Sequence, residues 1–249
     1  MKLAEATWQD VAALDHDRAV LIAPYAACEQ HGPHLPYFTD AFLVTAVAEG
    51  VEQRLGDAVL LAPTQWLGAS SHHLPFGGVL SAPVDLHVRL ITDPLREYLR
   101  RGWRKILVLN GHGGNIDTYH VALRNLHDEF PESHLLGASY WEAAEAQIAA
   151  RMEGPKKDVG HAGEAETSLM LAVRPDLVRM EKRSDCLRHL RPELDGLYVP
   201  FDMKGRTREG ADGYPSFANR EKGEGMLAAI IERVAEVARG LIAGPDWQD

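Results

Sequence analysis

The sequence lacks the features that mark secreted and membrane-bound proteins. Its 249 residues include two cysteines, Cys28 and Cys186, which are too few for a disulfide framework and fit a reducing compartment. No apolar run approaches the roughly 18 to 20 residues of a membrane-spanning helix. Glu5 and Asp10 lie where a secretory signal needs an uninterrupted apolar stretch. These absences predict a soluble, cytoplasmic protein with no membrane partner.

An excess of positive charge is also missing. The chain has 26 Lys and Arg against 36 Asp and Glu, for a formal net charge of -10. Proteins that bind nucleic acid concentrate basic residues on one face, so we expect no nucleic-acid partner. A small anionic substrate remains compatible with this balance, because the local charge at a site can oppose the global sign.

What the sequence does have is a core-forming composition and a repeated pattern of strands and helices. Hydrophobic residues make up 45% of the chain, enough for one large α/β domain over residues 1–249. Apolar periodicity predicts strands at 19–24, 58–62, 105–109 and 134–139. It predicts helices at 39–55, 83–101, 116–129, 141–152, 161–173 and 221–242. The stretch 179–219, rich in Pro, Gly and charge, has no assignment.

Two local features refine these helices. Pro94 predicts a kink in the helix at 83–101, or its division into two. Thr39 or Asp40 is expected to cap the N-terminus of the helix at 39–55.

The alternation of buried strands with helices predicts a mostly parallel sheet covered by helices on both faces. In such sheets, ligands bind beyond the carboxyl ends of the strands. The polar segments CEQHGPH (28–34) and NGHGGN (110–115) directly follow the first and third predicted strands. We therefore expect the functional site at this edge.

Several residues near this edge have the chemistry of metal ligands. Glu29 and His31 are two apart in an extended segment, so their side chains point the same way. Asp40 begins the next helix, and a carboxylate can bridge two cations roughly 3.5 Å apart. His112 lies in a glycine-rich turn, where the backbone can approach a ligand closely. Mixed nitrogen and oxygen ligands suit Zn, Mn or Fe better than Ca or Mg.

Other interpretations of the same residues stay open. A single His or Asp after a strand is more often a cap, a turn former or a solvated loop residue. The glycine-rich NGHGGN segment is also a candidate anion-binding nest. It has neither the P-loop spacing nor the dinucleotide-binding spacing.

Three longer segments together resemble the signature blocks of the creatininase family. They are 29–40 (EQHGPHLPYFTD), 110–115 (NGHGGN) and 161–171 (HAGEAETSLML), in the family's order. Residues 67–81 (LGASSHHLPFGGVLS) are similar to the family's second loop, G-x-S-x-x-H followed by F-P-G-T. The resemblance runs from about residue 18 to the C-terminal helix.

The resemblance implies a fold, an assembly and a ligand set. The fold is a three-layer α/β/α sandwich, and the assembly is a homohexamer. Two divalent ions per subunit are expected, with Glu29 and His112 on one, His31 on the other and Asp40 bridging them.

This chain departs from the creatinine-hydrolysing members at two places. Those enzymes carry a metal-binding Glu in place of Gly114, so another carboxylate must serve here. We expect Glu166 in that role, with Glu164 as the alternative. Trp141 matches one tryptophan of their aromatic lid, but the other falls at about Lys157. Creatinine is therefore doubtful as the natural substrate.

The expected reaction is attack on an amide or formamide carbonyl by a metal-bridging hydroxide. Two ions lower the pKa of the bridging water from about 15.7 to about 7. His161, with a pKa near neutrality, would protonate the leaving nitrogen, or else only complete the start of its helix. The N–H groups of Gly113 and Gly114 would help to stabilise the oxyanion. His73 and Trp141 are candidate substrate contacts or packing residues, and His34 is expected to be structural.

Three functions follow from these expectations. The leading one is hydrolysis of a non-peptide C–N bond in a small molecule by a dinuclear-metal amidohydrolase. The second is a metal-dependent peptidase that trims a peptide-derived cofactor precursor. The third is a non-catalytic metal-binding α/β scaffold. A serine hydrolase is excluded, because no G-x-S-x-G segment follows a strand.

Overall fold

The computed structural model describes residues 1–189, 193, 196–200 and 202–244. In this part of the chain, four parallel strands form one sheet in the order β2–β1–β3–β4. Their bounds differ from the predicted ones by no more than one residue at either end: β1 Val20–Tyr25, β2 Val59–Leu61, β3 Lys105–Asn110 and β4 His134–Ser139. In register, Leu21 of β1 is paired with Leu60 on one side and with Ile106 on the other.

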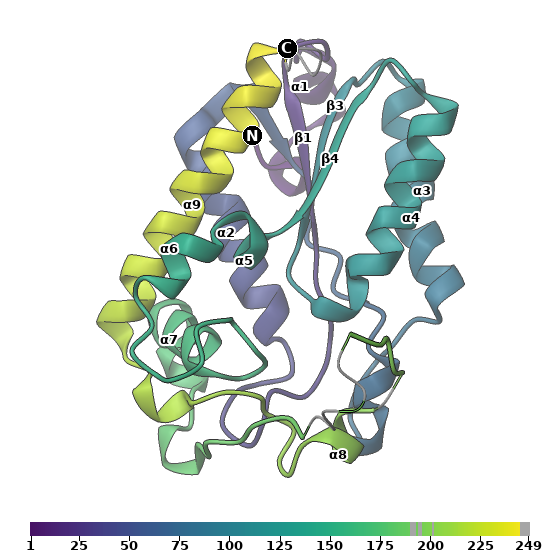
Figure 1. The fold of residues 1–249 in the computed structure, drawn as a ribbon. Coiled ribbons are helices and arrows are strands. Elements are labelled where there is room, and N and C mark those ends of the chain that lie inside the picture. The colour runs from purple at the N-terminus through teal and green to yellow at the C-terminus, as the bar shows by residue number, and fades with distance from the viewer. Residues whose placement is uncertain (190–192, 194–195, 201, 245–249) are drawn as a thin grey trace.

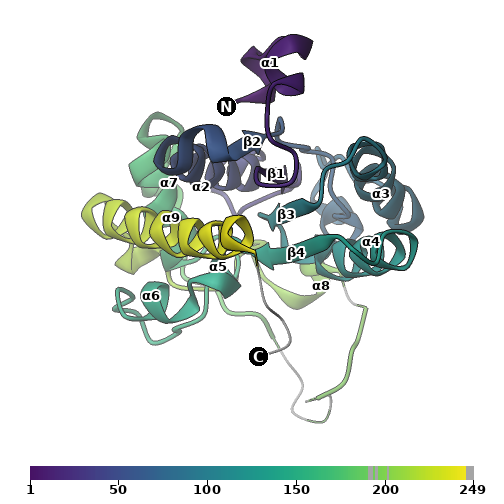
Figure 2. The ribbon, with the colours of Figure 1, turned by 90° about the horizontal axis from the view of Figure 1, so that it is seen from above.

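Helices cover both faces of this sheet, which confirms the three-layer α/β/α arrangement (Figures 1 and 2). Alternate residues of β1 point into different cores, because side chains of a strand alternate between its faces. Val20 and Ile22 pack on the side of three helices: α2 Thr39–Leu55, α7 Glu164–Val173 and α9 Arg220–Ala243. Leu21 and Ala23 pack on the side of α3 Val84–Arg100 and α4 Ile116–Glu129.

Helix α3 continues through Pro94 as one element, so the predicted division into two helices is wrong. Proline removes one backbone hydrogen bond from a helix interior. Pro94 lies on the exposed side of α3, where water can satisfy the freed carbonyl, while Ile91 and Leu95 on the other side are buried in the core. Burial of the apolar face therefore outweighs the local defect.

The helix predicted at 141–152 is instead two short helices, α5 Tyr140–Ala143 and α6 Glu145–Ala149. The backbone leaves the helical conformation at Ala144, with φ −121° and ψ 28°. Ala144 is fully buried, and nothing in its residue type signals a break. Tertiary packing here overrides local helix propensity.

Two predicted helix starts also differ. Helix α7 begins at Glu164 and not at His161, because His161 forms an antiparallel bridge with Asp212. The N-cap of α2 is Phe38, so neither Thr39 nor Asp40 has that role. The Thr39 hydroxyl donates to the Pro36 carbonyl, 2.7 Å away, which leaves the Asp40 carboxylate free for other contacts.

The remaining helical segments are short and lie in connections. They are α1 Trp8–Ala12, α8 Met203–Arg206, and 3-10 turns that include Ser71–Phe76 and Gly113–Asn115. In the unassigned stretch 179–219, α8 is accompanied by turns at Met180–Lys182 and Pro215–Phe217. None of the described helices is both long enough and apolar enough to cross a bilayer.

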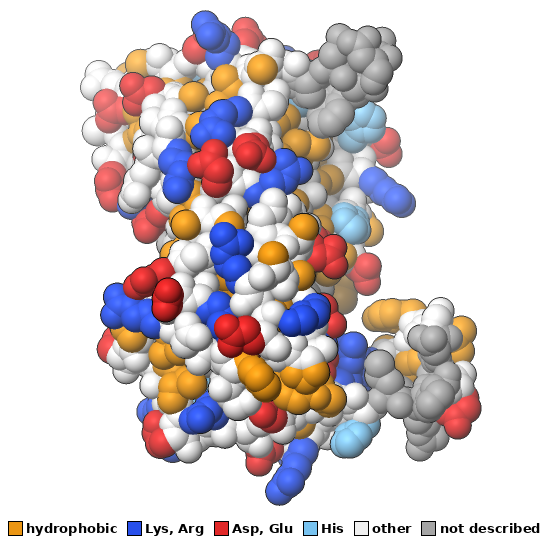
Figure 3. Space-filling model, turned by 60° about the vertical axis from the view of Figure 1, so that its left-hand side comes forward, with side chains coloured by type: hydrophobic (Ala, Val, Ile, Leu, Met, Phe, Trp, Pro, Cys, Tyr) orange, Lys and Arg blue, Asp and Glu red, His pale blue; other side chains and the backbone are white. Residues whose placement is uncertain are grey.

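Basic and acidic side chains are interspersed on the face that Figure 3 shows. Several of them pair along or beside α9, as in Arg233–Glu236 at 3.1 Å and Arg54–Glu232 at 3.3 Å. Such exposed pairs contribute at most about 1 kcal/mol each. The fold therefore depends on its two apolar cores rather than on these surface pairs.

The topology creates a crevice between β1 and β3. After β1 the chain enters α2, on one face of the sheet, and after β3 it enters α4, on the other face. The connections beyond the carboxyl ends of β1 and β3 thus diverge to opposite faces of the sheet, which is where ligands bind in open α/β sheets. The segments 28–34 and 110–115 lie at this place, as predicted.

Helices α7 and α9 approach closely at Gly223, and this contact is testable. A Cβ at Gly223 would overlap the backbone of Ser168, whereas a Cβ at Gly240, in the same helix, would meet nothing within 4 Å. We expect Gly223→Ala to lower the free energy of unfolding by about 1–3 kcal/mol through overpacking. The matched Gly240→Ala should raise it by up to about 1 kcal/mol through helix propensity. Urea denaturation measures both, and equal effects would contradict the close packing.

Candidate metal centre

Five side chains from four separate segments converge beyond the strand ends. Glu29 and His31 follow β1, and His112 follows β3, its neighbour in the sheet. Asp40 lies in the first turn of α2, and Glu166 lies in the first turn of α7. All five side chains are buried. The convergence expected for the predicted ligands is therefore present.

Asp40 lies between the two histidines. Its Oδ1 is 2.9 Å from His31 Nε2, and its Oδ2 is 3.3 Å from His112 Nδ1. The two oxygens of one carboxylate thus face two different imidazoles. This is the arrangement required of a carboxylate that bridges two cations.

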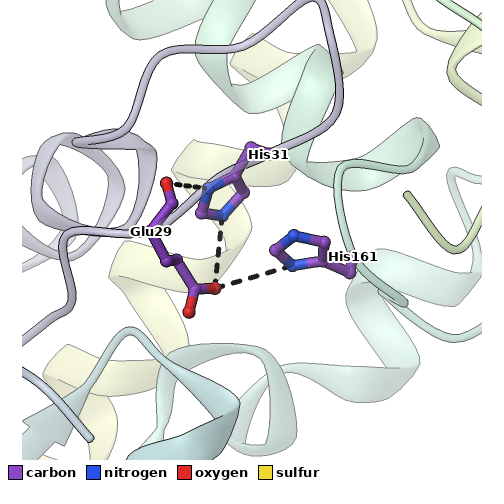
Figure 4. A group of neighbouring side chains, drawn as sticks. All are labelled: Glu29, His31 and His161. Atoms are coloured by element: carbon purple, nitrogen blue, oxygen red, sulfur yellow. Dashed lines mark hydrogen bonds and ion pairs between the residues drawn. The ribbon is translucent and has the colours of Figure 1, made fainter. Parts of the chain in front are cut away.

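Glu29 approaches the same nitrogens of these histidines as Asp40 does. Its Oε1 is 3.2 Å from His112 Nδ1 and 4.0 Å from His31 Nε2. The same oxygen is 3.7 Å from His161 Nδ1. Figure 4 shows His31 and His161 both directed toward Glu29. Glu29 is thus nearest to His112 and lies within reach of the whole cluster.

The structure separates the two candidate glutamates of α7. Glu166 Oε1 lies 3.9 Å from His31 Nε2, and its other oxygen accepts the Ala162 N–H. Glu164 instead accepts hydrogen bonds from Lys222 Nζ at 2.6 Å and from two backbone N–H groups, those of Glu153 and Gly154, at 2.8 Å each. Only Glu166 therefore faces the cluster.

In both His31 and His112, the ring nitrogen that does not face Asp40 contacts another polar group. His31 Nδ1 lies 3.3 Å from the Glu29 carbonyl, so it can donate a proton there and leave Nε2 toward Asp40. His112 Nε2 lies 3.3 Å from Ser70 Oγ and 3.4 Å from the Ala69 carbonyl. Such contacts orient metal-binding imidazoles and select their tautomer.

Two oxygens of the cluster indicate how well a cation would fit. Glu29 Oε2 and Asp40 Oδ2 are buried and have no hydrogen-bond partner. A buried carboxylate oxygen without a partner is costly unless a cation compensates it. The nitrogen and oxygen donors also match the preferences of Zn, Mn and Fe. The residues therefore fit divalent transition metals.

The electrostatics of the cluster point the same way. Burial alone would lower the pKa of both histidines, but the surrounding carboxylates raise it to about 9 for His31 and to about 10 for His112. Burial raises the pKa of Glu166 to about 7. Burial would also raise the pKa of Asp40, yet the two histidines lower it. Protonated imidazoles thus supply the positive charge that metal ions could supply instead.

Gln30 connects two further histidines to the cluster. Its Oε1 accepts the Gly32 N–H at 2.8 Å and its Nε2 donates to the Gly210 carbonyl at 2.9 Å, which fixes how the amide is oriented. Nε2 also lies 2.8 Å from His73 Nδ1, so that nitrogen accepts and the proton of His73 is on Nε2, 3.3 Å from Glu29 Oε2. The N–H side of His73 therefore faces Glu29 without making a hydrogen bond to it.

His161 lies at the edge of the cluster, where its ring is 4.4 Å from that of His31, between centroids. Its Nε2 donates to the Gln30 carbonyl at 2.7 Å, which leaves Nδ1 as an acceptor facing Glu29. Burial and the charge of His31 hold the pKa of His161 well below 6.5. The expected near-neutral pKa is therefore wrong for this arrangement, because the ring is desolvated and lies beside a cation.

A cleft of about 1100 Å³ opens onto the cluster. Four predicted substrate contacts line it: His73, Gly113, Gly114 and Trp141. Trp141 also packs against the core, so both of its expected roles stay open. His34 does not line the cleft, and its Nε2 lies 2.9 Å from Thr167 Oγ1 on α7, a structural contact.

Sequence reasoning missed His72. Its ring lines the cleft and stacks on His112, with centroids 5.6 Å apart and planes 14° from parallel. Burial, His112 and Arg206 lower the pKa of His72 to about 4. The motif spacing G-x-S-x-x-H selects His73. The only sequence signal for His72 is that it lies next to His73.

Comparisons with known proteins find similarity along almost the whole chain. A family model described as creatinine amidohydrolase (creatininase) matches residues 4–238. The creatinine amidohydrolase of Pseudomonas putida is 30% identical, with 95% of each chain covered. A mycofactocin precursor peptide peptidase of Mycobacterium ulcerans is 34% identical over 91% of this chain and 87% of that protein.

Solved creatininase structures are also similar to this chain over almost its whole length. A creatininase with Mn superposes with a TM-score of 0.81 at 30% identity, covering 96% of this chain and 97% of that one. A mutant creatininase of Zn–Zn type has a TM-score of 0.80 at 30% identity, with 96% of each chain covered.

The two glutamates of α7 should behave differently when their charge is removed. We expect Glu166→Gln to weaken metal binding by more than the roughly 10- to 100-fold that loss of an outer-shell partner costs. Glu164→Gln should retain metal but lower the free energy of unfolding by about 1.5–3 kcal/mol, because Lys222 loses one charged partner and keeps Glu153 and the Phe217 carbonyl. Chelator competition and urea denaturation measure the two effects. Metal loss in Glu164→Gln alone would reverse the assignment.

Proposed function

This chain belongs to the creatininase family, and from that premise we propose that it is a dinuclear-metal amidohydrolase. Its substrate is a small molecule with a non-peptide C–N bond, such as a cyclic amide or a formamide. Two divalent ions per subunit, Zn, Mn or Fe, are held by Glu29, His31, Asp40, His112 and Glu166.

One observation carries this proposal. The oxygens of the buried Asp40 face His31 and His112 separately, at 2.9 and 3.3 Å. Glu166 adds a carboxylate on the His31 side, and Glu29 adds one nearest to His112. A single cation would leave one of these groups of donors unused, so the geometry favours two positions that share Asp40.

Two divalent ions in such a site lower the pKa of a water and polarise a carbonyl, the chemistry that amide hydrolysis needs. His161 supplies the proton transfers. Its Nε2–H is committed to the Gln30 carbonyl, so Nδ1 takes the proton of the attacking water and returns it to the leaving nitrogen. His73 Nε2 faces Glu29 Oε2 at 3.3 Å. The Gly113 and Gly114 N–H groups border the cleft where an oxyanion would form.

Creatinine itself fits this chain poorly. A Cβ at Gly114 would lie against the Ala69 carbonyl and 2.5 Å from His112 Nε2, so this position has no room for a glutamate. Lys157, not a tryptophan, lines the cleft at the position expected for the second lid residue. The cleft of about 1100 Å³ also exceeds what a single small ring fills. We therefore propose a larger amide or formamide substrate.

Peptide trimming is the second candidate, supported by the same cleft volume and by the similarity to the mycofactocin precursor peptide peptidase. The experiment that separates the two is a hydrolysis assay of the Zn-, Mn- and Fe-loaded protein. Formamides, lactams and cyclic ureides form one panel, and short peptides form the other. Turnover confined to the peptide panel would overturn the leading proposal.

Replacing the shared carboxylate should remove both ions. We expect elemental analysis to find about two equivalents of transition metal in the wild-type protein and almost none in Asp40→Ala. The exposed Asp93→Ala on α3 is the control and should retain both. A metal-free wild-type protein of normal stability would overturn both enzyme proposals.

Replacing His161 should separate proton transfer from metal binding. We expect His161→Gln to lower kcat by roughly 10²- to 10⁴-fold, the usual contribution of general acid–base catalysis. Metal content should stay at the wild-type value, because His161 Nδ1 is a proton acceptor in the proposal. Loss of an ion in this variant would make His161 a ligand.

A further inference from the structure

We propose that His72 is a further metal ligand, which joins Glu29 and His112 on one side of the centre. The inference rests on the proposed dinuclear site and adds a donor that the family's motifs do not predict. Glu29, His72 and His112 each offer a ligand atom, and the three atoms lie within 4.8 Å of one another.

The two adjacent histidines of the 71–76 turn have different roles because their nitrogens are differently engaged. His73 Nδ1 accepts from Gln30, and its Nε2 faces Glu29 Oε2 at 3.3 Å. His72 makes ring contacts with His73 and His112 but has no hydrogen bond or ion pair among the described residues. Its nitrogens are therefore available for a cation.

The packing at Gly114 explains why His72 can approach. A Cβ at Gly114 would come within 2.7 Å of His72 Cε1 and 2.5 Å of His112 Nε2. A side chain at Gly114 and the present position of His72 therefore exclude each other. The absence of a side chain lets the Ala69–His72 segment close over the turn that carries Gly114.

This ligand makes the two metal positions unequal. The position near His112 would have His112, His72 and Glu29 together with Asp40 Oδ2. The position near His31 would have only His31 and Glu166 together with Asp40 Oδ1. Catalytic metal sites keep an open position, whereas sites with four protein ligands tend to be closed. Substrate should therefore bind on the His31 side, beside His161.

The test compares His72→Phe with wild type and with His127→Phe, a matched change at an exposed position of α4. Phenylalanine preserves the ring that stacks on His112 but removes both nitrogens, so packing and ligation are separated. Zn²⁺ binding is titrated against a chelator, and the Co²⁺-loaded proteins are compared by proton NMR, where bound imidazole N–H groups give strongly shifted exchangeable signals. His72→Ala, which demands no space, is the second variant should the phenylalanine impair folding.

In His72→Phe we expect one of the two Zn²⁺ dissociation constants to rise by at least about 10-fold. The Co²⁺ spectrum should lose one shifted imidazole signal, whereas His127→Phe should match wild type in both measurements. A wild type with two ions and an unchanged His72→Phe would overturn the assignment of His72 alone. A wild type that binds no transition metal would overturn the proposed centre as well.

Discussion

The site depends on the contact of one buried carboxylate with two imidazoles. Asp40 can face His31 and His112 together because the connection from β1 to α2 brings the first turn of α2 beside the segments that follow β1 and β3. Three buried carboxylates in one cluster would repel one another unless positive charge lies between them. The raised pKa values of His31 and His112 show that the protein already gathers such charge there.

The parallel sheet supplies the rigidity that this contact needs. β1 and β3 are fully buried neighbours, and their ends deliver Glu29, His31 and His112 from backbone held on both sides. Glu166 arrives from another direction, on a helix packed against α9. The Glu164–Lys222 ion pair links α7 to α9, and Glu164 takes no part in the cluster. One turn of α7 therefore carries both a structural carboxylate and one that faces the cluster.

Much of the fold and part of the site could be predicted from the sequence, because periodicity and strand-end motifs are local signals. Strand positions follow from apolar runs, and the convergence of residues 28–34 with 110–115 follows from parallel topology. The division at Ala144 and the continuity through Pro94 could not be predicted, since both depend on what the helices pack against. The low pKa of His161 likewise arises from burial and from the charge of His31, a residue distant along the chain.

His72 is a residue of the site that sequence motifs do not identify. A motif records which residue types recur at a spacing, and by that criterion His73 is the notable residue of its loop. The physical role depends on hydrogen bonds made across the fold. The amide of Gln30 is hydrogen-bonded to His73, whereas His72 has no hydrogen bond among the described residues. Because Gly114 has no side chain, the loop can also close until His72 lies against His112. A change at one position of the turn after β3 is thus coupled to the loop after β2. Differences in substrate among such proteins should therefore follow these two segments together rather than either one alone.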